Sequence, residues 1–367
     1  MVASFGRDAF KLPSFPTSLA EVTSEWVTGV LGAPKRSDVT IRIPQARIGY
    51  GSEIGFLDIA SDDPAVPSSL VVKVPPKDRR TREAVIQFGA FRRELMFYRS
   101  IAPHVPIRTP KVYVMELDAE TGSGILLVED CSQMKSFLFG QSPPTLDQLL
   151  QTVTTLAKLH AAWWDKTEAL PQEVNRHDPE TWNAWLADIQ SGWQQWQSSP
   201  LSAHLDDAAA ALCQRLSGDF VNCSNLRPST NLTLCHMDFH IQNLFYDTAS
   251  EEDPVVVIDW DSCGVGCGPH DLAYLMSLLP TLHRKDNESE ILQRYHEELL
   301  ANGVTGYDEE AMYTDYRIGS LLATSLQPVL LNLVALDSEA LHLIGSLASR
   351  QLQMVVDHKA QQLLDTR

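Results

Sequence analysis

The stretch LCHMDFHIQNLFYD, residues 234–247, carries the strongest information on fold and chemistry in this sequence. It contains His236, Asp238 and Asn243 in the order H-x-D-x-x-x-x-N, and the next apolar run, VVVID, ends in Asp259. An acid at the tip of a buried strand suits a metal–triphosphate site, where one Asp accepts or orients the proton of an attacking hydroxyl while an Asn and a second Asp hold divalent ions. Because such oxygen ligands suit magnesium, we predict a magnesium–nucleotide site here, rather than a turn in which these side chains only cap the backbone.

Two upstream residues fit the same chemistry. Lys73 lies in the apolar run SLVVKVP, which is typical of a strand, and Glu94 lies in FRRELMFYRSIAP, which has helical spacing. A lysine on an apolar strand either reaches solvent at an edge or pairs with an acid, and Glu94 is the natural candidate. Gly49 and Gly51, in RIGYGSEIGF between two predicted strands, would let backbone N–H groups approach phosphates, although a plain hairpin also explains them.

The remaining pattern separates a β-rich front from a helical back. Up to residue 130, helical and strand-like stretches alternate at 16–32 (helix), 39–74 (strands), 79–101 (helix), 111–117 and 124–130 (strands). Beyond residue 131 the sequence predicts helices, interrupted by two short strands at 233–238 and 254–261. We therefore predict two lobes, 1–130 and 131–367.

With these motifs, the sequence resembles the aminoglycoside phosphotransferase and choline kinase superfamily, and within it the ecdysteroid-kinase-like branch. The resemblance rests on CHMDFHIQN, VVIDWD, GPHDLAYL and GILLVEDCS, with the strand around Lys73 and the helix around Glu94, and it extends over nearly the whole chain. It implies an α+β, protein-kinase-like two-lobed fold, with a small β-rich N-lobe that binds nucleotide and a larger helical C-lobe that holds the catalytic loop and the acceptor site. The implied activity is ATP-dependent transfer of the γ-phosphate to a hydroxyl of a small molecule.

The resemblance also implies roles for residues of the C-lobe. Asp238 would be the catalytic residue, which receives or orients the proton of the acceptor hydroxyl, and Asn243 and Asp259 would bind magnesium. The chain has Asp259-Trp260-Asp261 where protein kinases have D-F-G, and it shows no A-P-E segment. Both departures follow the small-molecule branch and argue against a protein substrate.

In the N-lobe, the resemblance implies contacts with the nucleotide. Lys73 would hold the α- and β-phosphates, and Glu94 would fix Lys73 as its ion-pair partner. The segment from Glu129 to Cys131 would be the hinge that meets adenine through backbone groups.

Two further motif residues are expected to support the catalytic loop rather than to react. Asp271 follows Gly268-Pro269-His270 and precedes LAYLM, so it is typical of a helix N-cap. In the family that the chain resembles, this Asp braces the catalytic loop. His236 is expected to brace the same loop rather than to bind a metal.

The charge balance limits the partners. Lys and Arg number 29 against 47 Asp and Glu, which gives a net charge of −18. This charge repels nucleic-acid phosphates and anionic lipid, so we expect no nucleic-acid or membrane partner, and it weakly favours a cationic acceptor. No apolar run is long enough to span a membrane, the start MVASFGRDAFKLPSF does not resemble a secretory signal, and the six cysteines form no C-x-x-C pair. We therefore expect a cytoplasmic protein with reduced cysteines.

The acceptor is the least defined part of this prediction. Six of the eight tryptophans fall within residues 163–196 at helical spacing, which favours core packing but also suits an aromatic wall for a flat or cationic substrate. Asp261 is the nearest acid in sequence that could pair with a positive group. Aminoglycoside-like, choline-like and sterol-like acceptors all remain open.

Two other interpretations use the same residues. His236, Asp238 and His240 alternate, and together with Asp259 they could assemble the two-metal site of a metal-dependent hydrolase. Such an enzyme would have no use for a phosphate-binding lysine paired with an acid. A catalytically inactive nucleotide-binding module is the other possibility, and the joint presence of all the motif residues speaks against it.

Overall fold

The computed structural model describes residues 15–34, 38–42, 51–118, 122–174, 179–226, 228–250, 252–333 and 338–365. The chain divides into two compact units, Met1–Leu95 with Lys111–Asp130, and Met96–Pro110 with Cys131–Arg367. Residues 96–110 thus belong to the second unit, whereas the sequence pattern grouped them with the first. Among the described helices, none combines the length and the apolar character that crossing a membrane requires.

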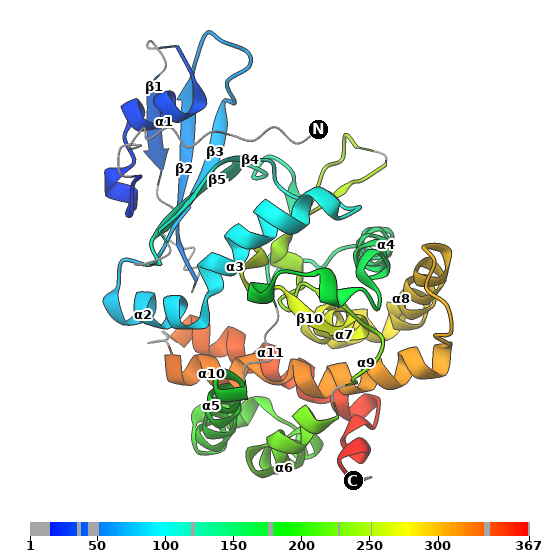
Figure 1. Ribbon diagram of the computed structural model, residues 1–367. Helices are drawn as coiled ribbons and strands as arrows, with labels where there is room; N and C mark the ends of the chain where they lie inside the picture. The colour runs from blue at the N-terminus through cyan, green and yellow to red at the C-terminus, as the bar shows by residue number, and fades with distance from the viewer. Residues whose placement is uncertain are drawn as a thin grey trace. The chain divides into compact units, whose positions relative to one another are not determined.

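The first unit is built on a five-stranded antiparallel sheet in the order β1-β2-β3-β5-β4 (Figure 1). Its strands are β1 (Asp38–Arg42), β2 (Glu53–Ala60), β3 (Ser69–Val74), β4 (Val112–Leu117) and β5 (Gly124–Glu129). Helix α1 (Ser24–Leu31) buries Val27 in a core with Leu57, Val72 and Leu127 of the sheet. Because side chains alternate along a strand, Lys73 points to the opposite face from Val72.

Helix α3 (Ala90–Met96), the second helix after β3, packs on that opposite face. Helix α2 (Arg79–Phe88) ends at Gly89, whose φ of 64° is the left-handed conformation that glycine adopts readily at a helix end. Helix α3 (Ala90–Met96) and a π-helical turn (Phe97–Ile101) come next, so the single helix predicted over 79–101 is in fact interrupted. Phe91 packs so closely on the sheet that a Cβ at Gly124 would lie 2.7 Å from its ring.

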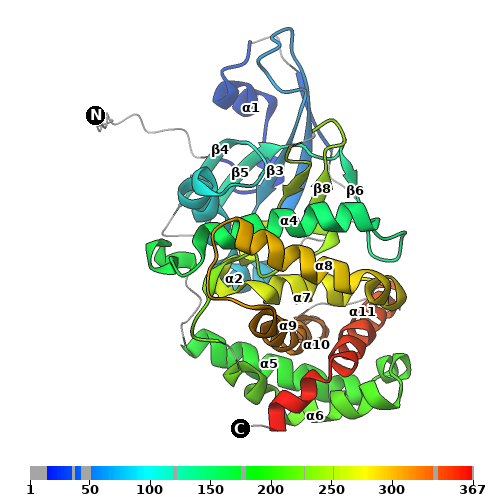
Figure 2. The same ribbon diagram turned by 90° about the vertical axis from the view of Figure 1, so that its right-hand side faces the viewer.

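The second unit is mainly helical (Figures 1 and 2). Its helices are α4 (Leu146–Trp163), α5 (Pro179–Ser198), α6 (Asp207–Asn225), α7 (Gly268–Leu278), α8 (Thr281–Ala301), α9 (Glu309–Ala323), α10 (Leu326–Leu333) and α11 (Ser338–Asp357). Helices α4 and α8 lie side by side (Figure 2), as do α7 and α9. Helix α4 begins with the capping box that Thr145 and Gln148 form, which accounts for its sharp start.

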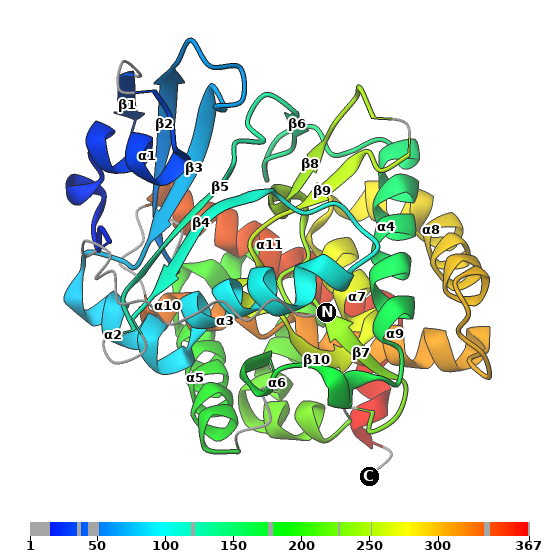
Figure 3. The same cartoon turned by 45° about the horizontal axis from the view of Figure 1, so that its top comes forward.

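Two small antiparallel sheets hold the polar loops of this unit (Figure 3). One pairs β7 (Leu232–Cys235) with β10 (Gly264–Cys267), and the other orders β6 (Lys135–Ser136), β8 (Leu244–Tyr246) and β9 (Val255–Val257). Strands β7 and β9 lie in the two predicted runs, whereas β6, β8 and β10 were not predicted. The chain between β7 and β8 and the chain after β9 contain the motif residues.

The tryptophan stripe belongs to the core. Trp193 and Trp196 on α5 have no exposed surface and pack with apolar residues of α6 and α11, and Trp185 packs against the same core. The aromatic acceptor wall is therefore wrong for Trp193 and Trp196, which are core residues, whereas Trp185 is only partly buried. The side chain of Trp182 lies outside the described residues.

Candidate active site

The loop between β7 and β8 is held in place by Asp271, in the first turn of α7. Its Oδ2 accepts a hydrogen bond from the backbone N–H of His236 at 2.6 Å, and its Oδ1 accepts one from the N–H of Met237 at 2.9 Å. Met237 has a φ of 67°, which is costly for a residue with a side chain. The two bonds to one buried carboxylate stabilise this backbone conformation and so fix where Asp238 begins.

His236 ties the loop to the strand that precedes Asp259. Its Nε2 donates to the carbonyl of Ile258 at 2.9 Å, and its Nδ1 accepts the N–H of Asp238 at 3.3 Å. Burial lowers the pKa of His236, which keeps the ring neutral, as these two bonds require. Because both ring nitrogens are engaged within the protein, His236 supports the loop and does not have the geometry of a metal ligand.

Asp238 lies among hydrogen-bond donors. The Nδ2 of Asn243 is 2.9 Å from its carbonyl oxygen and 3.2 Å from its Oδ2, and the Nε2 of His240 is 3.4 Å from the same Oδ2. Burial by itself would raise the pKa of Asp238, but His240, His236 and the Tyr274 hydroxyl outweigh it and hold this pKa well below its usual value. The carboxylate is therefore ionised at neutral pH and can receive or orient a proton.

Strand pairing brings the backbone of Asn243 next to that of Ile258, the residue before Asp259. Leu244 of β8 pairs with Val257 of β9, and the N–H of Ile258 donates to the carbonyl of Asn243 at 3.0 Å. Asp259 follows at once, with a left-handed φ of 66° that turns the chain out of the strand. Because the amide nitrogen of Asn243 donates to Asp238, the amide oxygen of Asn243 is the atom that would bind a cation. An amide oxygen and a carboxylate are hard ligands that fit Mg²⁺.

In the first unit, the structure brings Lys73 and Glu94 together. Lys73 on β3 pairs with Ile54 of β2 and Leu126 of β5, so it lies in the middle of the sheet and not at its edge. Its Nζ is 2.7 Å from Oε1 of Glu94 on α3, and the two side chains are 9% and 2% exposed. The buried ammonium is thus held by a charged partner on the helix that packs on that face.

The other nucleotide-site candidates are less defined. Gly51 lies in a bend before β2, and Gly49 lies outside the described residues. Glu129 ends β5, where its N–H donates to the carbonyl of Lys111 at 2.8 Å. Cys131 begins the second unit and packs with Phe245, so the segment from Glu129 to Cys131 contains one of the three points where the chain passes from one unit to the other.

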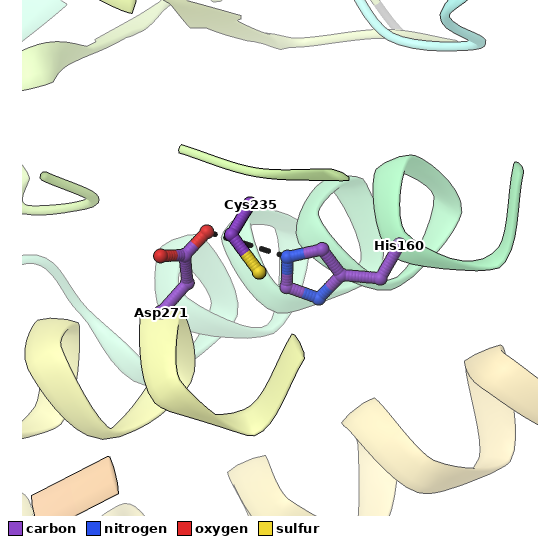
Figure 4. A group of neighbouring side chains, drawn as sticks. All are labelled: His160, Cys235 and Asp271. Carbon is purple, nitrogen blue, oxygen red and sulfur yellow. Dashed lines mark hydrogen bonds and ion pairs between the residues drawn. The ribbon is translucent and has the colours of Figure 1, made fainter. Parts of the chain in front are cut away.

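At the start of the loop between β7 and β8 lies a buried group of His160, Cys235 and Asp271, whose ligand-type atoms are all within 4.8 Å of one another (Figure 4). His160 Nε2 is 3.3 Å from Oδ2 of Asp271, and His160 Nδ1 is 2.8 Å from the Tyr295 hydroxyl. These bonds, with those to the loop backbone, use both oxygens of Asp271 and both ring nitrogens of His160. The group therefore acts as a hydrogen-bonded brace, and a metal would have to break it.

The sequence pattern missed two parts of this arrangement. His160 lies on α4 and shows only as a polar residue in an apolar helix, so nothing local indicates its bond to Asp271, 111 residues away. Gly268 is the second: a Cβ there would lie 2.5 Å from the Tyr295 hydroxyl and 2.7 Å from Nδ1 of His160. Its position in GPHDLAYL, directly before the bracing Asp, was the available signal.

Comparisons with known proteins identify the family and the fold of this chain. The family model described as the ecdysteroid kinase-like family matches residues 50–303. Among solved structures, a microcompartment-associated aminopropanol kinase is similar, with a TM-score of 0.57 at 14% identity over 93% of this chain and 98% of that one. A putative aminoglycoside phosphotransferase from Ralstonia eutropha has a TM-score of 0.54 at 13% identity over 92% of this chain and 97% of that one.

The GDP complex of wild-type aminoglycoside 2′-phosphotransferase-IIIa has a TM-score of 0.53 at 15% identity over 92% of this chain and 98% of that one. A comparison with curated protein sequences found no match. At these identities the structural likeness establishes the fold, which is the two-lobed α+β fold of kinase-like phosphotransferases.

Proposed function

The chain belongs to the ecdysteroid kinase-like family, and from this premise we propose that it is an ATP-dependent phosphotransferase that acts on a hydroxyl of a small molecule. The observation that carries the proposal is the loop in which Asn243 donates to Asp238, while the carbonyl of Asn243 accepts the N–H of Ile258, the residue before Asp259. An oriented carboxylate, together with an amide and a carboxylate that can bind magnesium, is what transfer from a nucleoside triphosphate requires.

In the second unit, Asp238 would receive or orient the proton of the acceptor hydroxyl as its oxygen attacks the γ-phosphorus. A new oxygen–phosphorus bond then forms, the bond from the γ-phosphorus to the β–γ bridging oxygen breaks, and ADP leaves. Asn243 and Asp259 would hold magnesium, which, when bound, neutralises charge on the phosphates. Since the pKa of Asp238 is low, this residue contributes more by orienting the hydroxyl than by storing its proton.

In the first unit, Lys73 would bind the α- and β-phosphates, and Glu94 would keep its ammonium oriented. The 2.7 Å contact between two almost fully buried side chains supports this role, because one cation in a fixed position is worth more than a mobile one. Gly49 and Gly51 would approach the phosphates, and the backbone from Glu129 to Cys131 would meet adenine.

A two-metal hydrolase fits the geometry less well. It would need His236 and His240 as ligands, yet His236 donates to a backbone carbonyl and accepts a backbone N–H. His240 accepts the N–H of Gln242 through Nδ1, and its Nε2 lies 3.4 Å from Oδ2 of Asp238. Both rings would have to abandon these bonds to bind metal.

The acceptor is proposed only by class. The aminopropanol kinase and the aminoglycoside phosphotransferases are named for amine-bearing substrates, and the net charge of −18 favours a cation near this chain. We therefore place hydroxylated amines first among the acceptors to test, followed by choline-like and sterol-like alcohols.

The test combines binding with turnover. Calorimetric titration of the wild-type chain should show ATP binding that depends on magnesium, and an acceptor screen should show ADP release above the rate with MgATP alone. Asp238→Asn keeps the size of the side chain and should reduce turnover by about 10²- to 10⁴-fold, while the Kd for MgATP stays within a few fold. A wild-type chain that binds no MgATP would contradict the proposal, as would full turnover by Asp238→Asn.

A further inference from the structure

We propose that His240 is a positioning residue, whose Nε2–H holds the carboxylate of Asp238 in the orientation needed for transfer. This inference rests on the proposed function, because it assigns His240 a part in the reaction at Asp238. His240 lies two residues after Asp238, in the loop that leads into the short helical turn Ile241–Asn243.

One side of the His240 ring caps that turn. The N–H of Gln242 donates to Nδ1 of His240 at 3.2 Å, and the extended backbone of His240, with φ −142° and ψ 167°, is the usual conformation of a cap. A nitrogen that accepts an N–H cannot itself carry a proton. The neutral ring therefore has its proton on Nε2.

The other side of the ring faces Asp238. Nε2 is 3.4 Å from Oδ2 of Asp238, and Nδ2 of Asn243 approaches the same oxygen at 3.2 Å. The hydrogen bond from Asn243 and the nearby Nε2 of His240 meet at one oxygen, so together they restrict the rotation of the carboxylate and, with it, the direction of Oδ1. An acceptor hydroxyl then meets a carboxylate that needs no reorientation, and misplacement of a reacting group by about 1 Å can cost about 100-fold in rate.

Aromatic side chains hold the ring in this place. Phe139, from the segment after β6, has its ring centre 5.3 Å from that of His240, and Tyr274 on α7 has its ring centre 6.2 Å away. The side chain of His240 is 14% exposed, so its rotation is limited by contact on more than one side. The ring is thus fixed by a cap, a carboxylate and two aromatic neighbours.

Two substitutions separate the two functions of the ring. Gln has its amide nitrogen near the position of Nε2, so His240→Gln retains the donor to Asp238 and loses the cap. Asn has its amide oxygen near the position of Nδ1, so His240→Asn retains the cap and loses the donor. His296→Gln serves as the control, because His296 is a buried histidine whose Nε2 donates to the carbonyl of Tyr307, outside the catalytic loop.

The experiment measures ADP release from MgATP alone, with water as acceptor, together with KM for MgATP and the melting temperature. We expect His240→Asn to lower kcat about 10- to 100-fold with an unchanged KM and a melting temperature near wild type. We expect His240→Gln to keep kcat within a few fold but to melt earlier, and His296→Gln to keep wild-type kcat. Wild-type kcat in His240→Asn, or an equal loss in both His240 variants, would overturn the proposal.

A second measurement does not depend on turnover. The ¹⁵N chemical shifts of the His240 ring should show a proton on Nε2 and none on Nδ1, and the Nε2 signal should move in Asp238→Ala. A proton on Nδ1, or an Nε2 signal that does not change in Asp238→Ala, would overturn the positioning role. This holds even if the protein shows no measurable turnover. Failure to bind MgATP would instead refute the proposed function, so the two failures are distinguishable.

Discussion

Removing one partner of the Lys73–Glu94 pair should destabilise the protein far more than removing both. At 2.7 Å, two unit charges attract by about 6 kcal/mol with an effective dielectric constant of 20, before the cost of desolvation is subtracted. Side chains that are 9% and 2% exposed cannot be rescued by water when a partner is lost. We expect Lys73→Met and Glu94→Met each to lower the free energy of unfolding by about 3–5 kcal/mol.

The double variant tests the physical reason. Methionine is an apolar residue of similar length to lysine and glutamate, and replacing a buried ion pair by apolar residues of similar volume is often neutral. The variant Lys73→Met/Glu94→Met should therefore lie within about 1–2 kcal/mol of wild type. Urea denaturation of the four proteins gives a coupling energy between the two positions, which should amount to several kcal/mol.

A matched control is an ion pair of similar length that is exposed to solvent. Arg79 Nε and Glu83 Oε1 on α2 are 2.8 Å apart, but their side chains are 91% and 64% exposed. Solvent screening reduces such a helical pair to about 0.3–0.5 kcal/mol. The same cycle there should give little coupling. If the Lys73 and Glu94 effects were additive, or no larger than those of the control, the pair would not hold the lysine and our account of the first unit would be refuted.

Two further predictions concern the brace. Gly268→Ala would push a Cβ against the Tyr295 hydroxyl and the His160 ring, so we expect a loss of about 1–3 kcal/mol in the free energy of unfolding and a lower kcat. Gly218→Ala on α6, where the Cβ meets nothing within 4 Å, is the control and should be neutral or stabilising. Equal melting temperatures of the two variants would contradict the bracing role of this group. Asp271→Asn leaves one carbonyl oxygen for two backbone N–H groups, so urea denaturation should show a loss of about 1–3 kcal/mol and ADP release should fall, whereas wild-type kcat would show that the loop keeps its shape without this carboxylate.

The sequence was informative where a polar residue interrupts an apolar run. Lys73 within SLVVKVP and Asp259 after VVVI are unusual enough on a strand to indicate a site by themselves. Lys73 lies on β3, one residue before the strand ends, and Asp259 lies two residues after the end of β9. A functional polar residue that must be buried is recognisable in the local sequence, because apolar residues flank it on the strand.

Local patterns were silent where the structure depends on pairing across the chain. Strand β10 has the sequence GVGC, with little strand propensity, and exists because it pairs with β7. The break in the helix over 79–101 required recognition of Gly89 as a left-handed end within FGAF. Strand β10 depends on a tertiary contact, and the helix end at Gly89 depends on a backbone conformation that glycine permits but does not require.

The tryptophan stripe shows the limit of periodicity as evidence for function. A helical stripe of large aromatic side chains is what either a core or a binding wall would contain, and only the surrounding helices decide between them. Here Trp193 and Trp196 have no exposed surface and belong to a core cluster that includes residues of α6, α10 and α11. A search for the acceptor should therefore move away from α5.

The surroundings of Asp238 are the better place to begin that search. Phe139 and Tyr274 are grouped around His240, and both also contact the small apolar cluster that contains Ala323 and Leu347. Phe139 and Tyr274 pack against the ring of His240, so a shift in either side chain would also disturb Asp238. An acceptor that packs against these two side chains would therefore affect the orientation of the carboxylate. Recognition of the acceptor and orientation of the catalytic group would then depend on one set of residues, and substitutions at Phe139 should change the choice of acceptor together with kcat, rather than KM alone.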